Sequence, residues 1–294
     1  MKKPILSAKS DLVFKLIFGH PKRTDILADF LKSVLTIPED EYESIEIVDP
    51  ILKIEEIDDK IGILDIKIHT TSKIVIDVEI QVLPVSDMIE RILFYHSKMI
   101  TGQIIKGNDY DVIKKTISII ILDYTILKNN SYVNKFTLYD KHTLTELTDK
   151  IEINILELPK LPEIPDNTEI WKWLAFLKAD KEEELMTLAN KNPQIKKAVG
   201  VLKELSEDER LQMLEEYREK ARRDEYARKK YIINEARTQG LEEGRQEGIQ
   251  QGKYERNIEI AINLLSMNSP EEQISRATGL TLEEIKKIAQ AQSL

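Results

Sequence analysis

The sequence contains no cysteine and only four histidines among its 294 residues. Disulfides, thiolate catalysis and cysteine-bound zinc or iron–sulfur clusters are therefore excluded, and the histidines do not stand in a metal-ligand spacing. No apolar run approaches the length of about 20 residues that spans a membrane, and no secretory signal is recognisable, so we expect a cytoplasmic protein. The net charge of −9 argues against a general nucleic-acid coat but is compatible with one local binding site.

The composition changes near residue 160, where three prolines occur within seven residues. Before this point isoleucine, valine and leucine dominate, and the pattern predicts two helices, three strands, a helix and three strands. After it lysine, glutamate, glutamine and alanine dominate, and only helices are predicted. The fold class we expect is α/β, of the mixed α+β kind, followed by an all-helical C-terminal region. The expected divisions are a core at 1–160, a helical connector at 161–205, a long charged helix at 206–256, and a helix-turn-helix-like tail of three helices at 257–294.

The most informative segment is IGILDIKIHTTSKIVIDVEIQV, residues 61–82, where apolar and polar residues alternate on both sides of a short polar loop. Such alternation predicts a β-hairpin with one apolar and one polar face. A two-residue turn would set apolar residues of one strand beside polar residues of the other. A three-residue loop at Thr71–Lys73 keeps the faces matched, and longer odd loops would also do so but would leave the pairs diagonal. The pairs that this register predicts are Asp65 with Glu79 and Lys67 with Asp77.

Two facing carboxylates, Asp65 and Glu79, repel each other, and a divalent cation relieves that repulsion. Mg²⁺ prefers one or two carboxylates together with water and phosphate oxygens, and it can activate the water for attack on a phosphoryl group. Gln81, on the same face as Glu79, can orient this water or hold a phosphate oxygen. An ordinary solvated hairpin face remains the alternative interpretation of the spacing alone.

Several motifs in the chain carry a family resemblance: SDLVFKLIFG (10–19), LDI (64–66), VEIQ (78–81), R-x3-Y-x7-Q-x3-G (91–107) and LELPK (156–160). The D-x13-E-x-Q arrangement resembles the active-site motif of the PD-(D/E)XK nuclease superfamily. The wider chain resembles its Rpn branch, the recombination-promoting nucleases also described as putative transposases. The run GLEEGRQEG and the tail segment NLLSMNSPEEQISRATGLTLEEI are similar to that family as well.

The resemblance implies a restriction-endonuclease-like core and a metal-dependent DNA endonuclease. Asp65 and Glu79 would bind the metal, which is Mg²⁺ or alternatively Mn²⁺ or Ca²⁺, and Gln81 would act beside them. Asp11 is a further candidate ligand, because an acidic residue on the first core helix often joins the metal site in the superfamily. The alternative role of Asp11 is a favourable interaction with the helix dipole.

Gln81 stands where most relatives carry a lysine, and glutamine cannot supply that positive charge. Lys67, on the same face, is a candidate substitute, unless it only pairs with Asp77. Three residues of the predicted helix after the hairpin, Arg91, Tyr95 and Gln103, are further candidates for DNA binding. Arg91 and Tyr95 share a helix face, so they either contact a phosphate or flank the core.

The predicted long helix contains no proline but four glycines at intervals of four: Gly240, Gly244, Gly248 and Gly252. Each costs about 1 kcal/mol relative to alanine in a helix interior, so a close helix–helix contact, a flexible joint or disorder is indicated. We expect a homodimer through the C-terminal helical region. Capping boxes are predicted at Ser206/Glu209, Ser269/Glu272 and Thr281/Glu284, with Gly279 ending a helix between the last two.

Three functional classes are compatible with these features. The first, which we predict, is a metal-dependent DNA endonuclease associated with recombination or transposition. The second is a catalytically inactive DNA-binding or transposon-associated protein that retains the nuclease fold. The third is a helical interaction scaffold in which the hairpin carboxylates only face solvent.

Overall fold

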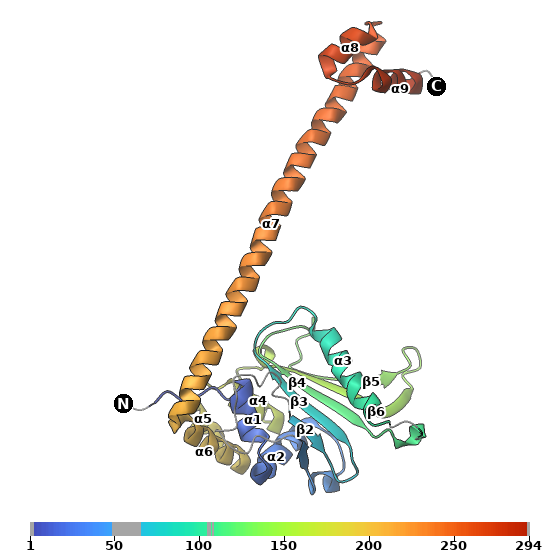
Figure 1. The fold of residues 1–294 in the computed structure, drawn as a ribbon. Helices are drawn as coiled ribbons and strands as arrows, with labels where there is room; N and C mark the ends of the chain where they lie inside the picture. Colours follow the sequence, from blue (N-terminus) through green and yellow to red (C-terminus); the bar gives the residue numbers. More distant parts are fainter. Residues whose placement is uncertain (1–2, 49–65, 105–106, 108, 293–294) are drawn as a thin grey trace. The chain divides into compact units, whose positions relative to one another are not determined.

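The computed structural model describes residues 3–48, 66–104, 107 and 109–292. Within them a mixed sheet of six strands is followed by helices, so the predicted fold class is confirmed. The predicted order of elements is also present in the first half of the chain (Figure 1). These elements are α1 Asp11–Phe18, α2 Thr24–Val34, β1 Glu46–Val48, β2 Ile66–His69, β3 Val75–Gln81, α3 Met88–Thr101, β4 Thr116–Leu122, β5 Val133–Tyr139 and β6 Glu146–Glu157.

The strands lie in the order β1-β2-β3-β4-β6-β5. β3, β4 and β6 run parallel to one another, and the other neighbouring pairs are antiparallel. Every residue of β4 is buried, because helices cover both faces of the sheet there. α1 and α2 belong to the core on one face, and α3 packs on the other through Met88 and Ile92 (Figure 1).

The hairpin has the register that a three-residue loop requires. Lys67 pairs with Asp77 and Ile66 with Val78, as the alternation predicts. Lys73 closes the loop with φ 65°, in the left-handed region, and its N–H donates to the carbonyl of Thr70 at 3.0 Å. Asp65, the first of the two predicted carboxylates, lies outside the described residues.

The polar face of the hairpin is not a solvated surface over its whole length, because α3 covers part of it. Asp77 is only 5% exposed. Nearby, His96 of α3 and Ser118 of β4 share a hydrogen bond of 2.8 Å between Nδ1 and Oγ. Burial lowers the pKa of His96, so its imidazole is neutral at neutral pH. This contact fastens α3 to the centre of the sheet.

Six further helices follow the sheet: α4 Glu169–Lys178, α5 Glu182–Ala189, α6 Pro193–Glu207, α7 Glu209–Ser266, α8 Glu271–Thr278 and α9 Leu282–Gln292, within the described residues. The chain divides into two compact units, Met1–Tyr217 and Arg218–Leu294. The expected boundary near residue 160 therefore lies inside the first unit. The reason is that α4–α6 bury their apolar faces in the same core as α1 and α2, with Trp173 and Phe176 fully buried. The segment 161–205 is part of this core rather than a separate connector.

In the second unit, the end of α7 packs with α8 and α9 around a small apolar core of Ala261, Ile274, Leu280 and Ile285. The first of the three predicted tail helices is thus the last part of the 58-residue helix α7. The capping box of Thr281 and Glu284 is confirmed by reciprocal hydrogen bonds. Gly279 ends α8 with φ 75°, also as predicted.

The other two capping boxes are wrong. Ser206 lies inside α6, where its hydroxyl donates to the carbonyl of Leu202 at 2.7 Å. Asp208 caps the next helix instead, accepting from the N–H of Leu211 at 2.9 Å. Before α8 the capping position is held by Pro270 and not by Ser269. None of the described helices combines the length and the apolar composition that crossing a membrane requires.

Candidate active site at the end of β3

Glu79 and Gln81 lie near the carboxyl end of β3, on the sheet face that α3 covers. Glu79 Oε1 accepts a hydrogen bond from Nη2 of Arg91, on α3, at 2.9 Å. The two side chains are 16% and 34% exposed, respectively, so the ion pair is reachable from solvent. The guanidinium carbon of Arg91 also lies 5.5 Å from the ring centroid of Tyr95, as expected for two residues one helical turn apart. The structure therefore brings Arg91 to Glu79 and places the ring of Tyr95 beside the guanidinium of Arg91.

Gln81 occupies the last position of β3, and its Nε2 donates to the carbonyl of Leu83 at 3.3 Å. Its strand partner in β4 is Leu122, the last residue of that parallel strand. The N–H of Asp123, the next residue, donates to the carbonyl of Gln81 at 3.0 Å. The ends of β3 and β4 thus form one edge, the kind of place where open sheets with parallel strands bind ligands.

Gln103 is not part of this edge. Its amide donates to Oγ1 of Thr116 at 2.9 Å and accepts from the N–H of Lys114 at 2.7 Å. Thr116 begins β4, so Gln103 lies six residues along the strand from Leu122, which corresponds to about 20 Å. Both ends of the amide are engaged in joining the end of α3 to the start of β4. Gln103, a predicted DNA-binding residue, therefore lies apart from the rest of the candidate site.

Asp11, the first residue of α1, is placed near the same edge by its neighbours in the chain. Lys9 forms an ion pair with Asp123, with 3.0 Å between Nζ and Oδ2. Because Asp123 is bonded to the backbone of Gln81, the start of α1 approaches the carboxyl end of β3. Asp11 therefore stays a candidate ligand. Lys67, in contrast, is exposed and lies opposite Asp77, one strand away from Glu79.

Sequence reasoning missed Tyr124, which follows the apolar strand β4 and looks like part of it. Its side chain packs against the apolar cluster between α3 and the sheet. Burial raises the pKa of Tyr124, and the charges of Glu79 and Arg91 act on it as well, in opposite directions. The available signal was its position: a polar residue just beyond a buried strand, at the same edge as Gln81.

The motif LELPK has a structural role in the described residues. Glu157 ends β6 and is fully buried, and its Oε1 accepts from the N–H groups of Ile126 at 2.6 Å and Leu127 at 3.1 Å. Lys160 forms an ion pair with the same carboxylate. The motif therefore fixes the loop that follows β4 and Tyr124.

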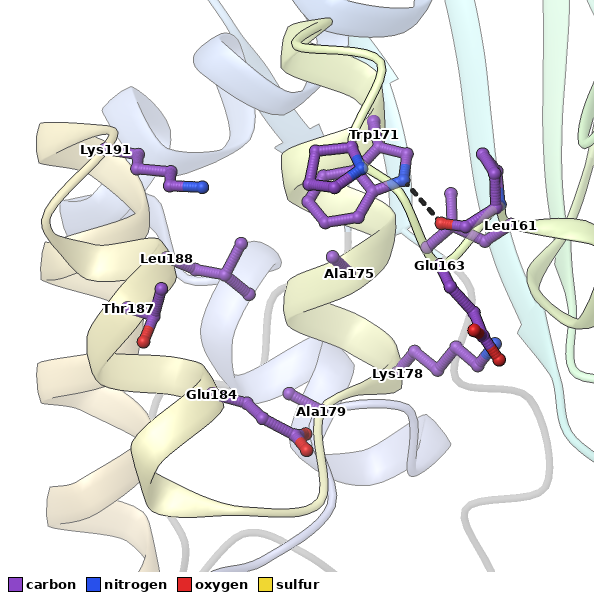
Figure 2. A pocket seen from close by; sticks show the side chains of 12 residues that line it. Leu161, Glu163, Trp171, Ala175, Lys178, Ala179, Glu184, Thr187, Leu188 and Lys191 are labelled. Carbon is purple, nitrogen blue, oxygen red and sulfur yellow. Dashed lines mark hydrogen bonds between the residues drawn. The ribbon is translucent and has the colours of Figure 1, made fainter.

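A pocket of about 430 Å³ lies elsewhere in the first unit, between α4 and α5 (Figure 2). Its wall is mostly apolar and includes Trp171, Ala175 and Leu188. The indole N–H of Trp171 is engaged with the carbonyl of Pro162 at 2.9 Å. None of the predicted site residues that the structure describes lines this pocket, so it has no part in the site at β3.

Residues 8–232 match the family model of the PD-(D/E)XK nuclease family transposases. The chain belongs to this family. The match includes the six strands and α1–α6, and it therefore confirms the resemblance and the restriction-endonuclease-like core. No curated protein and no solved structure matches the chain.

PD-(D/E)XK nucleases generally use divalent metals, and such an ion needs several oxygen ligands grouped in one place. Among the described residues no three acidic or histidine side chains are grouped to hold a metal. Glu79 and Gln81 nevertheless supply a carboxylate and an amide oxygen, the hard oxygen donors that Mg²⁺ accepts. Glu79 already has a cationic partner, and this partner is a movable side chain on another element. These two donors are of the kind that a divalent cation accepts, but among the described residues they do not make a complete metal site by themselves.

Proposed function

We propose that this member of the PD-(D/E)XK nuclease family is a metal-dependent DNA endonuclease that acts in recombination or transposition in the cytoplasm. The observation that carries the proposal is the partly exposed carboxylate of Glu79, paired with Arg91 at the edge where β3 and β4 end. A nuclease site needs such a carboxylate for the metal and a cation for the phosphate in one place. The inactive DNA-binding alternative needs no carboxylate for a metal, and the scaffold alternative needs neither group.

In the proposed site Asp65 and Glu79 hold one divalent cation, and Asp11 is a further ligand. The register of Lys67 with Asp77, continued by two residues along each strand, predicts Asp65 across from Glu79. When bound, the metal supplies an activated water and stabilises charge on the phosphoryl group. Gln81 orients the water or a phosphate oxygen through its amide, and Arg91 and Tyr95 contact the DNA backbone.

Supercoiled plasmid incubated with the full-length protein should be nicked or linearised when Mg²⁺ or Mn²⁺ is present. EDTA should stop the reaction, because the carboxylates cannot activate water without the cation. Agarose gel electrophoresis measures both products, and Ca²⁺ serves as a third cation. Retardation of the plasmid without cleavage in any of the three cations would favour the inactive DNA-binding alternative. An unaltered plasmid would favour the interaction scaffold.

We also propose that the protein is a homodimer through α7. A methyl group added at any of the four regularly spaced glycines, Gly240, Gly244, Gly248 and Gly252, would meet no atom within 4 Å in the described structure. Exposed apolar side chains lie beside them: Leu241 is 67% and Ile249 48% exposed. A second copy of the same helix would cover the surface that these glycines and apolar side chains form. Its contacts would offset the free-energy cost of four glycines in a helix interior.

Replacing Gly244 and Gly248 together by leucine should weaken the dimer, since the larger side chains prevent close approach of two helices. Light scattering at micromolar concentration should show a wild-type dimer and a lower mass for the variant. The matched control replaces Gln246 and Gln250, which lie about 120° to 160° round the helix from the two glycines, by leucine and should remain dimeric. A monomeric wild type, or a variant with unchanged mass, would contradict the proposal.

A further inference from the structure

Two side chains beside Glu79 have buried polar atoms without a hydrogen-bond partner among the described residues: Nε of Arg91 and the hydroxyl of Tyr124. Tyr124 packs on the cluster formed by Met88 and Ile92 of α3, the helix that also carries Arg91. The charges of Glu79 and Arg91 both influence Tyr124. The three side chains therefore share one small region at the end of β3.

Both of these polar groups lack an acceptor rather than a donor. The guanidinium N–H of Arg91 can only donate. The backbone N–H of Val85 points at the oxygen of Tyr124 as a donor would, which opposes the effect of burial on the pKa of Tyr124. No acceptor for the hydroxyl proton lies within hydrogen-bonding distance in the described residues. Burial raises the pKa of Tyr124, so this hydroxyl is protonated at neutral pH and available as a donor. Buried donors without acceptors are rare in native proteins, and a missing ligand is one explanation for them.

We propose that Arg91 and Tyr124 form a subsite for a non-bridging oxygen of the DNA phosphate, next to the carboxylate of Glu79. This inference rests on the proposed nuclease function and adds Tyr124 to the residues that touch the substrate. Both polar atoms are buried in the described structure, so an anionic oxygen becomes the acceptor that they lack only when the guanidinium of Arg91 moves away from Glu79. The guanidinium fork also matches the geometry of a phosphate.

The same arrangement assigns a second role to Arg91. In the described structure its Nη2 is bonded to Oε1 of Glu79 at 2.9 Å, where it balances the negative charge. A divalent cation bound by Glu79 would repel the guanidinium, which would then be free to pair with the phosphate. Arg91 thus supplies the positive charge that Gln81 does not. Lys67, the candidate that the sequence indicates for this charge, lies on β2 opposite Asp77.

Replacing Tyr124 by phenylalanine removes only the hydroxyl group and tests the subsite by DNA affinity. The replacement is made in the full-length Glu79→Gln protein, in which cleavage is expected to be at least about a thousandfold slower and Arg91 has no anionic partner at residue 79. Fluorescence anisotropy with a short labelled DNA duplex in EDTA should show the Kd increased about tenfold, the effect of one hydrogen bond to a charged group. The melting temperature should be unchanged or higher, because a buried donor without an acceptor is removed.

Tyr139→Phe in the same background is the matched control. Tyr139 is exposed and ends β5, where it pairs with Glu146, at the far end of β6 from Glu157. Its Kd should equal that of the Glu79→Gln parent. In a double-mutant cycle, Tyr124→Phe should have less effect once Arg91→Gln is present, because the two groups bind the same oxygen.

A Kd for Tyr124→Phe equal to that of the parent would overturn the subsite alone while plasmid cleavage by the wild type supports the nuclease. If the melting temperature were lowered as well, the hydroxyl would hold a structural water instead. If the wild-type protein neither cleaves nor binds DNA in any cation, the proposed function fails and the subsite fails with it.

Discussion

Glu79→Gln is expected to lower the rate of plasmid cleavage in Mg²⁺ by at least about a thousandfold. The amide keeps the size of the carboxylate but loses its charge, and the metal loses a ligand that contributes several kcal/mol to stabilising the transition state. The fold should survive. The lost ion pair with Arg91 is partly exposed, with side-chain exposures of 16% and 34%, and such pairs contribute at most about 1 kcal/mol.

The measurement is a time course of plasmid nicking together with a thermal melt of each variant. Glu146→Gln is a suitable control, because Glu146 is exposed at the start of β6, far along the strand from Glu157. It should cleave at the wild-type rate. Wild-type activity in Glu79→Gln would remove Glu79 from the metal site. A melting temperature far below that of the wild type would show instead that Glu79 is structural.

The local features of the site region could be read from the sequence because short-range patterns determine them. Strict alternation in residues 66–81 allows only registers that keep the apolar faces together, and the pairing of Lys67 with Asp77 follows. Gly279 and the pair of Thr281 and Glu284 were predictable for the same reason, since caps depend on residues three or four apart.

The contacts that complete the site could not be read in this way, because they depend on how α3 returns over the sheet. The bond between Arg91 and Glu79 joins residues on two elements that only tertiary packing brings together. The same packing separates Gln103 from Arg91, although both were predicted on one helix, since Gln103 is bonded to Thr116 at the start of β4. Tyr124 follows an apolar strand, so the sequence indicates its position near the strand end but not the charged side chains that lie near it.

The observed division of the chain after Tyr217 differs from the predicted boundary near residue 160 for a related reason. The change of composition near residue 160 reflects the charged outer surfaces of the later helices, whereas core membership depends on their buried faces. Trp173 of α4 contacts Phe18 of α1 and Phe30 of α2, with ring centroids 5.4 and 6.0 Å apart. A helix that follows the change of composition can therefore belong to the same core as α1 and α2.

Trp173→Ala tests whether α4 is part of the nuclease core. The side chain is fully buried, and its indole N–H donates to Oδ2 of Asp29 at 2.9 Å. Truncation leaves a cavity among aromatic rings, so the free energy of unfolding should fall by about 3–5 kcal/mol. Cleavage activity should be lost at temperatures where the variant unfolds.

The measurement is urea unfolding followed by the fluorescence of Trp171, which remains in the variant. Trp173→Phe is the matched control. It keeps most of the aromatic volume and loses the hydrogen bond to Asp29, whose carboxylate still accepts from Asn192 at 3.0 Å. The control should therefore lose much less stability than the alanine variant. If Trp173→Ala lost less than about 1 kcal/mol, α4 would dock only loosely. Residues 1–160 would then be expected to fold alone, whereas the shared core of α1, α2 and α4 predicts that this fragment does not.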